Sequence, residues 1–416
     1  MLKPIQSIAI IDPIGDFGIG GYVYELAEGL CANGVKVDVY TSGLAHMKDL
    51  VLPRNHGLYP VLGSPLVRQR GRLRHTPHSR TNTRSPSTPS GQEVVRERKG
   101  LAPKVASLLM PYELALYLKL RRYDVIWTQW PVMTRYGIQF WSICKALGMR
   151  LVHTVHNVLP HEEKQTDRAD VGRIYEYSDS LIVHSKHSQE ELLDIFPSLR
   201  GKTLLSRIGL FTMFPRVPER RMLVREELRI PDTSPLLLFY GSVRPYKNIE
   251  GALEALRDPR CANTILVVAG KEYGYPDAIP GDPLARTRRI AQDLGVEGRV
   301  RFISGVRDIP STSDLFEAAD ILLLPYLKSY GSGVLLLGMT FGLHILAART
   351  GGMEEYLEAY PGYTLLAGSD SDSIARGIDQ AWMQVSRSTA RRTFELPHLE
   401  WRTVAKEIIE SLDAVA

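Results

Sequence analysis

The sequence predicts an α/β protein of two domains, each built on a doubly wound parallel sheet. Short apolar and β-branched runs alternate along the chain with longer segments of helical periodicity, which is the pattern of βα units. Most of these runs are largely apolar, as expected of strands covered by helices on both faces. The length of 416 residues exceeds what one hydrophobic core supports, so we expect two domains of about 200 residues each.

The composition excludes several protein classes. With 44% hydrophobic and 23% charged residues, the chain is neither disordered nor fibrous. Its three cysteines form no CxxC pair, so we expect buried thiols rather than disulfides or a metal site. The amino terminus enters the first strand without an export signal, and no run approaches the roughly 20 apolar residues that cross a bilayer. We therefore expect a cytoplasmic protein that can rest on the inner face of the plasma membrane.

The first half of the chain carries five predicted strands. They are expected at Ile8–Ile11, Lys36–Tyr40, Val125–Thr128, Leu151–His153 and Ser180–His184. Helices are expected at about Tyr22–Asn33 and Thr134–Leu147, and the segment Leu101–Leu120 is amphipathic. That segment is expected to pack on the first sheet, and contact with an anionic membrane is the alternative.

The second half repeats this organisation. Strands are expected at Leu236–Tyr240, Ile265–Ala269, Val300–Ile303, Ile321–Leu324 and His344–Ala347, and helices near Asn248–Leu256, Pro283–Asp293 and Ser313–Ala318. A charged stretch with two prolines near Arg207–Pro218 separates the halves. We therefore expect domains over residues 1–210 and 211–395, followed by a helix over residues 396–416 that packs back across the hinge.

The positive charge is concentrated in one insert. The whole chain carries a net charge of +5, whereas the stretch from Arg68 to Lys99 alone holds nine basic and two acidic residues. Its middle is rich in Pro, Ser and Thr and has little to bury, so residues 68–100 are expected to form a mobile loop. No nucleic-acid-binding motif accompanies this charge, so we expect no nucleic acid partner. An anionic membrane or an anionic acceptor is the partner that the charge favours.

Two cations at the start of a helix in the second half predict a phosphate site. Arg244 and Lys247 follow a predicted strand, in Tyr-Gly-Ser-Val-Arg-Pro-Tyr-Lys-Asn. Cations there oppose the helix dipole, so a structural role brings them no benefit, whereas with the free N–H groups they suit a diphosphate. Two later loops on the same sheet suit a nucleobase edge and phosphate oxygens. The candidate binding residues are Gly241, Arg244, Lys247, Ser304, Gly305, Tyr330, Gly331, Ser332 and Gly333.

Histidines and carboxylates gather after a strand of the first domain. His156 and Glu162 lie in His-Asn-Val-Leu-Pro-His-Glu-Glu, at the carboxyl end of the strand Leu151–His153. Such a cluster can hold a proton-accepting group near its working pKa. Asp16 is a third candidate, in a glycine-rich turn after the first strand for which a purely structural role is an equal alternative. No two ligands have the spacing of a helical zinc site, so no metal is expected.

Several of these motifs resemble a known family. Over about residues 236–385, the sequence resembles the nucleotide-sugar-binding half of GT-B glycosyltransferases. Three motifs carry this resemblance in order: the strand with Gly-Ser-Val-Arg-Pro-Tyr-Lys-Asn, then Leu-Leu-Pro-Tyr with Ser-Gly-Val-Leu-Leu-Leu, then Phe-Gly-Leu-His-Ile-Leu-Ala. With His-Asn-x-x-Pro-His-Glu added, the chain looks most like the bacterial exopolysaccharide (xanthan-type) β-1,4-mannosyltransferase family, and more distantly like the retaining glycosyltransferase family 4. The retaining family has two glutamates where this sequence holds Ser329 and Leu337, which favours the former family.

The resemblance implies a fold, substrates and a mechanism. It implies two Rossmann-like domains facing an interdomain cleft, the N-terminal one for the acceptor and the C-terminal one for the nucleotide sugar. It implies inverting transfer of a hexose, from GDP-mannose by preference, to a lipid-linked or oligosaccharide acceptor in exopolysaccharide synthesis. Arg244 and Lys247 would hold the diphosphate without metal or other cofactor, and His156, Glu162 or Asp16 would take the acceptor proton. The alternatives are a retaining enzyme that uses a UDP-sugar, an epimerase of the same fold and a catalytically silent sugar-nucleotide-binding subunit.

Overall fold

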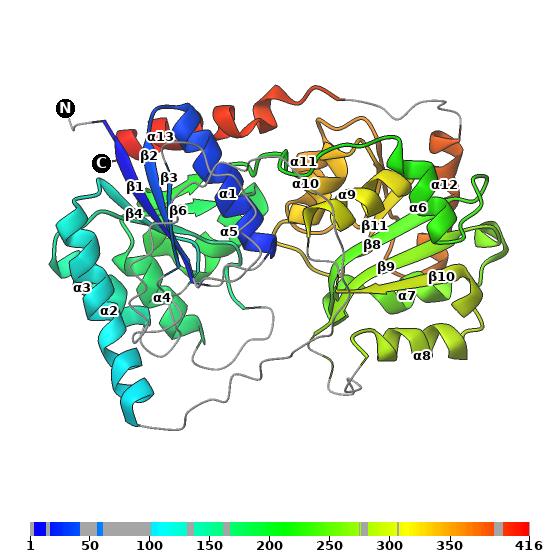
Figure 1. The fold of residues 1–416 in the computed structure, drawn as a ribbon, viewed down its shortest axis with the longest axis horizontal. Coiled ribbons are helices and arrows are strands. Elements are labelled where there is room, and N and C mark those ends of the chain that lie inside the picture. The colour runs from blue at the N-terminus through cyan, green and yellow to red at the C-terminus, as the bar shows by residue number, and fades with distance from the viewer. Residues whose placement is uncertain are drawn as a thin grey trace, which may run out of the picture.

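The computed structural model of the chain contains two parallel sheets, each covered by helices on both faces (Figure 1). It describes residues 4–13, 17–41, 56–60, 101–130, 137–160, 167–273, 275, 282–305, 308–386 and 394–415. The first sheet has seven strands in the order β3-β2-β1-β4-β5-β6-β7, and the second has six in the order β10-β9-β8-β11-β12-β13. Both orders reverse direction next to the first strand of the domain, which is the hallmark of doubly wound Rossmann-like domains. The predicted fold class is confirmed.

The N-terminal domain contains the first sheet and five α-helices among its described residues. Its strands are β1 (Ser7–Asp12), β2 (Lys36–Thr41), β3 (His56–Pro60), β4 (Val125–Thr128), β5 (Leu151–Thr154), β6 (Ser180–Val183) and β7 (Thr203–Leu205). Its helices are α1 (Phe17–Ala32), α2 (Leu101–Arg121), α3 (Gly137–Ala146), α4 (Asp167–Tyr177) and α5 (Lys186–Ile195), followed by the 3₁₀ turn η2 (Pro197–Lys202). The 68–100 insert lies outside the residues that the structure describes.

The C-terminal domain contains the second sheet. Its strands are β8 (Leu236–Val243), β9 (Ile265–Glu272), β10 (Val300–Ser304), β11 (Ile321–Leu324), β12 (His344–Ala347) and β13 (Tyr363–Leu365). Its helices are α6 (Arg220–Glu227), α7 (Ile249–Ala255), α8 (Ala285–Asp293), α9 (Ile309–Ala318), α10 (Gly333–Thr340), α11 (Met353–Leu357) and α12 (Ser371–Val385), and α13 (Trp401–Ala414) ends the chain. Its 3₁₀ turns are η3 (Pro245–Lys247), η4 (Pro259–Cys261), η5 (Glu297–Arg299) and η6 (Pro397–Leu399).

Helix boundaries differ from the sequence prediction where a capping residue decides them. Helix α9 begins at Ile309, four residues before the predicted start, because the carboxylate of Asp308 accepts a hydrogen bond from the Ser311 N–H at 2.7 Å. Strands β8 and β9 each run three residues past their predicted ends, since they pair in register from Leu236 with Ile265 to Val243 with Glu272. This extension carries the chain directly to the predicted phosphate site.

The last helix leaves the C-terminal domain and packs on α1 of the N-terminal domain, as Figure 1 shows along the upper edge of the molecule. Trp401 is buried, and its indole N–H donates to the Leu210 carbonyl oxygen in the hinge at 2.7 Å. Asn33 donates to the Arg402 carbonyl oxygen at 2.9 Å. Gly29 permits the close approach, because a Cβ there would overlap the Trp401 carbonyl and lie 3.1 Å from the Ala405 Cβ. Helix α13 thus ties the chain terminus to the first domain.

Replacing Gly29 with alanine should loosen this contact. The added methyl group must push α13 away from α1, and we expect a loss of about 1–3 kcal/mol despite the better helix propensity of alanine. Thermal unfolding measures the loss. Gly201→Ala is the matched control, because no atom lies within 4 Å of a Cβ at that position. Equal melting temperatures for the two variants would contradict the packing described here.

Candidate active site

The carboxyl end of β8 forms an unusually close strand contact. Gly241 has a φ of +94°, a conformation that L side chains rarely adopt. It pairs with Gly270 on β9, where a Cβ would overlap the Gly241 carbonyl oxygen. Only glycine fits at both positions, and the chain then turns through η3, which begins after Arg244. The close contact with β9 and the positive φ therefore explain why a glycine stands at position 241 of the predicted phosphate site.

Lys247 is a buried cation. Its side chain is only 7% exposed, and no carboxylate in the described ranges lies within ion-pair distance of its ammonium group. Its nearest defined contact is the Tyr326 ring, whose centroid lies 5.1 Å from Nζ. Burial, together with the nearby charge of Arg244, lowers the pKa of Lys247 to about 7. A cation in such surroundings is stabilised by an anion brought in as a ligand.

The first turn of α10 lies next to Gly241 and the Lys247 ammonium group. A Cβ at Gly241 would lie 3.4 Å from Lys247 Nζ and 3.6 Å from Val334 Cγ2, so the ammonium group and the helix start are neighbours. Ser332 caps α10 by accepting a hydrogen bond from the Leu335 N–H at 3.2 Å. Helix N-termini carry partial positive charge and free N–H groups, so the site combines two features that favour a phosphate.

The remaining predicted binding residues divide into two groups. Ser304 on β10 pairs with Gly270 on β9, which pairs with Gly241 on β8, so Ser304 lies level with Gly241 but two strands away, and Gly305 follows with a φ of +80°. Gly331 has open space around it, and Gly333 packs towards Phe211. The structure thus places Gly331 and Gly333 at the start of α10, whereas β9 separates Ser304 and Gly305 from the end of β8.

The side chain of Tyr330 lies elsewhere than expected. It is 4% exposed and packs in the hydrophobic core of the N-terminal domain, where its hydroxyl donates to Glu191 Oε1 on α5 at 3.0 Å. The phenol of Tyr330 is therefore directed away from the predicted phosphate site, and a contact of this residue with the nucleotide sugar stays a prediction for its backbone. Its ring and hydroxyl form a contact between the two domains, which no local sequence pattern indicates.

On the N-terminal sheet, His156 lies at the centre of an aromatic cluster. Its ring centroid is 5.0 Å from that of Tyr22, 5.6 Å from that of His184 and 5.8 Å from that of Trp130. Its Nε2 lies 3.1 Å from Gln129 Oε1. If that carbonyl oxygen accepts, Nε2 carries the proton and Nδ1 is the basic nitrogen. The cluster is built from α1 and the ends of β4, β5 and β6.

Electrostatics keep His156 neutral. Burial lowers its pKa well below the usual value, and the neighbouring imidazoles of His184 and His153 lower it further. The same burial lowers the pKa of His184 to about 4 and that of His153 to about 3. A neutral imidazole is the form that accepts a proton, and its lowered pKa also makes His156 a weaker base than an exposed histidine.

Four neighbours of His156 have buried polar atoms that form no hydrogen bond with any residue that the structure describes. They are Tyr22 Oη, Gln129 Nε2, Trp130 Nε1 and His184 Nε2. Unpaired buried polar groups are costly, so their concentration in one place indicates that water or a ligand satisfies them. Sequence reasoning did not select these residues, although Gln129, Trp130 and His184 each directly follow a strand of the first sheet. Glu162 and Asp16, the other two candidate bases, lie outside the described residues.

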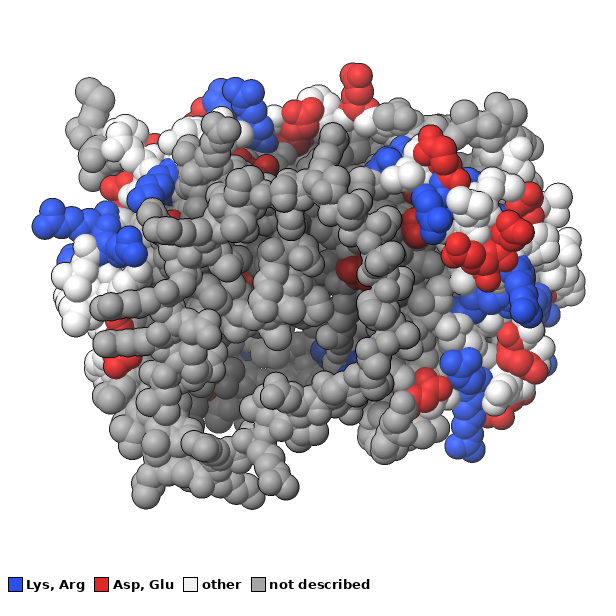
Figure 2. All heavy atoms as spheres, in the orientation of Figure 1, with Lys and Arg blue, Asp and Glu red and all other residues white. Residues whose placement is uncertain are grey.

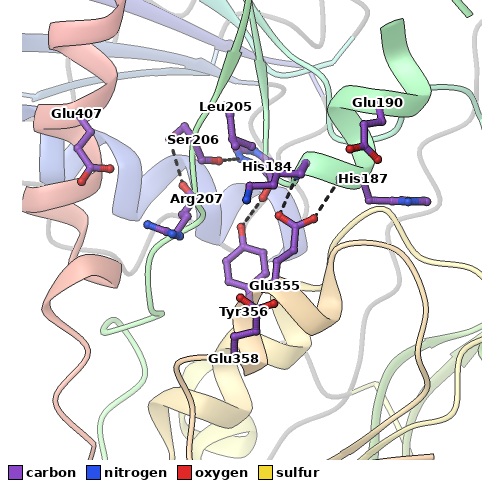
Figure 3. A pocket seen from close by; sticks show the side chains of 11 residues that line it. His184, His187, Glu190, Leu205, Ser206, Arg207, Glu355, Tyr356, Glu358 and Glu407 are labelled. Atoms are coloured by element: carbon purple, nitrogen blue, oxygen red, sulfur yellow. Dashed lines mark hydrogen bonds between the residues drawn. The ribbon is translucent and has the colours of Figure 1, made fainter. Parts of the chain in front are cut away.

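A pocket of about 440 Å³ opens beside this cluster, between the two domains. It is lined by His184, Lys186, His187, Glu190, Leu205, Ser206, Arg207, Glu355, Tyr356, Glu358 and Glu407. In Figure 3 the phenol of Tyr356 points towards His184, whose carbonyl oxygen accepts from it at 2.8 Å. The same hydroxyl accepts from the Ile208 N–H at 2.9 Å. Tyr356 thus joins α11 to the strand ends of the N-terminal domain.

Within the described ranges, no group of three or more histidine, cysteine or carboxylate side chains is placed to hold a metal ion. The positive side chains that the structure offers at the predicted phosphate site are Arg244 and Lys247.

Solved structures with the same architecture are glycosyltransferases and related synthases. Sucrose-phosphate synthase from Thermosynechococcus elongatus superposes with a TM-score of 0.65 at 19% identity, covering 99% of this chain and 94% of that one. Anabaena HepE in complex with UDP and glucose gives a TM-score of 0.65 at 16% identity, covering 98% and 100%. These similarities define the fold as GT-B.

The family follows from sequence comparison. Residues 18–202 match Glycosyltransferase Family 4, and residues 221–389 match Glycosyl transferases group 1. The chain belongs to these group 1, family 4-like GT-B glycosyltransferases.

Curated relatives support the same level of assignment. D-inositol 3-phosphate glycosyltransferase 2 of Catenulispora acidiphila is 27% identical over 274 residues, which is 62% of either chain. The enzyme of that name from Streptosporangium roseum is 26% identical over 279 residues, 62% of this chain and 61% of that one. The match thus spans less than two thirds of these relatives. They are inositol phosphate glycosyltransferases rather than xanthan-type mannosyltransferases, so the resemblance holds for the GT-B family and not for the narrower group.

The unpaired charge of Lys247 should make stability depend on pH in a specific direction. Its pKa in the folded protein is lower than in the unfolded chain, so the cost of burying the charge is complete below about pH 7 and disappears as the pH rises towards 10.5. We expect Lys247→Met to raise the free energy of unfolding at pH 6–7 by roughly 1–4 kcal/mol, and this gain to shrink at pH 9–10. Urea unfolding at several pH values measures it.

The exposed Lys271, at the end of β9, provides the control variant Lys271→Met. That substitution should leave the pH dependence unchanged. A Lys247→Met protein that is less stable than the wild type at pH 6–7 would mean that the ammonium group has a stabilising partner.

Proposed function

We propose that the protein transfers a sugar from a nucleoside diphosphate sugar to an acceptor hydroxyl, between the facing edges of its two sheets. The single observation that carries this proposal is Lys247, a buried cation without a carboxylate partner in the described ranges, beside the start of α10. A diphosphate supplies the missing negative charge. Family membership agrees, and HepE, one of the structural neighbours, has been solved with UDP-glucose.

The same groups suit the chemistry of the leaving group. When the bond between the sugar and the diphosphate breaks, negative charge develops on the diphosphate. Lys247, Arg244 and the N–H groups at the start of α10 would stabilise that charge without a metal ion. These groups are held in place before the substrate arrives, because Lys247 is buried and the first turn of α10 is capped by Ser332.

We further propose an inverting reaction with His156 as the base, unlike the retaining family 4 that residues 18–202 match, because the two glutamates of that family are missing here. In an inverting transfer, a base takes the acceptor proton while the hydroxyl attacks opposite the leaving group. A neutral His156 on the opposite domain suits this role. The two positions that hold glutamates in the retaining family offer no carboxylate here. Leu337 is packed in the core, and the Ser329 hydroxyl donates back to the Gly331 carbonyl oxygen at 3.2 Å.

For the substrates, we propose GDP-mannose as the donor and a lipid-linked or oligosaccharide acceptor of exopolysaccharide synthesis. The exposed face of α2 supports a lipid-linked acceptor. Tyr112, Leu116 and Leu120 lie four residues apart and are 50%, 55% and 74% exposed. Three basic residues, Lys119, Arg121 and Arg122, follow or interrupt this stripe, and Figure 2 shows basic side chains gathered at that outer edge of the N-terminal domain.

Such a surface fits an anionic membrane, with apolar side chains entering the headgroup region and cations meeting lipid phosphates. No helix in the described part of the chain has the length and apolar character to span a bilayer. The contact that we propose is therefore peripheral.

Donor binding and turnover should separate the roles of the two domains. We expect GDP-mannose or UDP-glucose to raise the melting temperature of the wild type, and Lys247→Met to weaken nucleotide binding about 30- to 150-fold because a charge-assisted contact is lost. His156→Ala should keep that affinity but lose about 10²- to 10⁴-fold in turnover. Slow donor hydrolysis, followed as released nucleoside diphosphate, gives a readout that needs no acceptor.

Lys271→Met serves again as the control for a lost surface charge. A wild-type protein that binds no nucleotide sugar would contradict the proposed function. Binding without consumption, even with a lipid-linked acceptor present, would favour the silent subunit. Full turnover in His156→Ala would remove this residue as the base.

Membrane contact through α2 should depend on its exposed stripe. We expect the double variant Leu116→Asp/Leu120→Asp to lose binding to vesicles that contain phosphatidylglycerol, because two charges enter the proposed contact. Sedimentation with vesicles measures it. Met222→Asp/Leu223→Asp is the matched control, since these α6 side chains are 51% and 49% exposed. Equal loss of binding in both variants would show that α2 is not the contact.

A further inference from the structure

The loop before α10 is held by the opposite domain. The Tyr330 carbonyl oxygen accepts hydrogen bonds from the hydroxyls of Ser188 and Ser185, at 3.0 and 3.4 Å, and its phenol donates to Glu191 Oε1 at 3.0 Å. The Lys328 ammonium lies 3.6 Å from the same carboxylate oxygen and 4.9 Å from the centroid of the Tyr330 ring. One carboxylate of the N-terminal domain therefore contacts two side chains of this loop.

The three contacting residues of the N-terminal domain share one face of α5. Ser185 is the N-cap of the helix, and Ser188 and Glu191 follow at intervals of three residues. The ring of Tyr330 is buried in the core of that domain. The loop is thus fixed through its backbone, its phenol and its ammonium group to a single rigid element.

A second contact from the C-terminal domain also holds the start of α5. The Glu355 carboxylate accepts hydrogen bonds from the N–H groups of Lys186 and His187, at 2.9 and 3.1 Å, and so caps α5 across the domain boundary. Figure 3 shows Glu355 directed at the start of that helix, beside Tyr356. Gly352 permits this approach, because a Cβ there would overlap the Ser185 side chain.

The other end of the loop is the phosphate site. Only two residues separate Tyr330 from Gly333, where α10 begins, and Val334 in the first turn lies beside Gly241 and Lys247. The position of the α10 N-terminus relative to the Lys247 ammonium group is therefore set in part by where Tyr330 is held. Tyr330 in turn is held by α5.

We propose that Glu191 is a positioning residue for the nucleoside diphosphate. It belongs to the acceptor domain, yet through Tyr330 and Lys328 it fixes the loop that leads into the phosphate-binding end of α10. The donor site is complete only when α5 is docked on this loop, so donor binding and the docked arrangement of the domains favour each other. This inference rests on the proposed function, because it assigns a nucleoside diphosphate to the Lys247 site.

Three variants in the full-length protein test the proposal. Glu191→Ala removes the acceptor of the phenol, Glu191→Gln keeps an oxygen acceptor but loses the charge, and Asp194→Ala removes an exposed carboxylate from the same helix as a control. We expect Glu191→Ala to weaken binding of GDP and UDP about five- to tenfold in calorimetry, the effect of about one ordinary hydrogen bond. Glu191→Gln should recover most of the affinity, and Asp194→Ala should match the wild type.

A second measurement needs no nucleotide. Hydrogen–deuterium exchange of the amides in residues 328–335 should rise about tenfold or more in Glu191→Ala, since the Tyr330 phenol and the Lys328 ammonium group lose their contact with Glu191, and should stay at the wild-type level in Asp194→Ala. Unchanged loop exchange, or unchanged GDP and UDP affinity while Lys247→Met still weakens binding, would overturn the positioning role and leave the proposed function intact. A wild-type protein that binds neither nucleotide would overturn both.

Discussion

The burial of one ammonium group, that of Lys247, organises the candidate active site. A charged amine in the interior needs a partner, and the described ranges supply no carboxylate for it. Three local features lie around this group: the left-handed Gly241, Gly270, where a Cβ would overlap the Gly241 carbonyl oxygen, and the capped start of α10. Burial of the charge without a partner lowers the stability of the ligand-free protein, and we expect an anion that binds next to it to restore that stability.

In the inverting reaction that we propose, the two domains contribute opposite chemistry. The C-terminal sheet edge carries positive charge for a leaving group, and the N-terminal sheet edge carries an imidazole that its neighbours keep neutral. Neither edge works alone, because transfer needs the base and the leaving group on opposite sides of the same sugar carbon. The contacts of Tyr356, Glu355 and Tyr330 across the boundary therefore belong to the active site as much as to the fold.

Much of the fold, and part of the site, could be predicted from sequence because local patterns determine them. Apolar runs such as Ile321–Leu324 are strands buried on both faces, and Arg244 and Lys247 were recognisable from their place at a helix start. Short elements such as β13, with three residues, carry too little pattern to be seen. The direction of the Tyr330 side chain was not foreseen, and Tyr22 and Gln129 were missed, because their contacts involve partners more than 25 residues away in the chain. Contacts of this kind between distant parts of the chain produce no periodic pattern in the sequence.

The most direct measurement of the central claim is the number of protons taken up when a nucleoside diphosphate binds. Calorimetric titration of GDP and UDP at pH 8, in two buffers of different ionisation enthalpy, gives this number. A free Lys247 with a pKa of about 7 is largely neutral at pH 8 and becomes protonated beside a diphosphate, so the account predicts uptake of close to one proton per site. Binding without proton uptake, or uptake that persists in Lys247→Met, would contradict it.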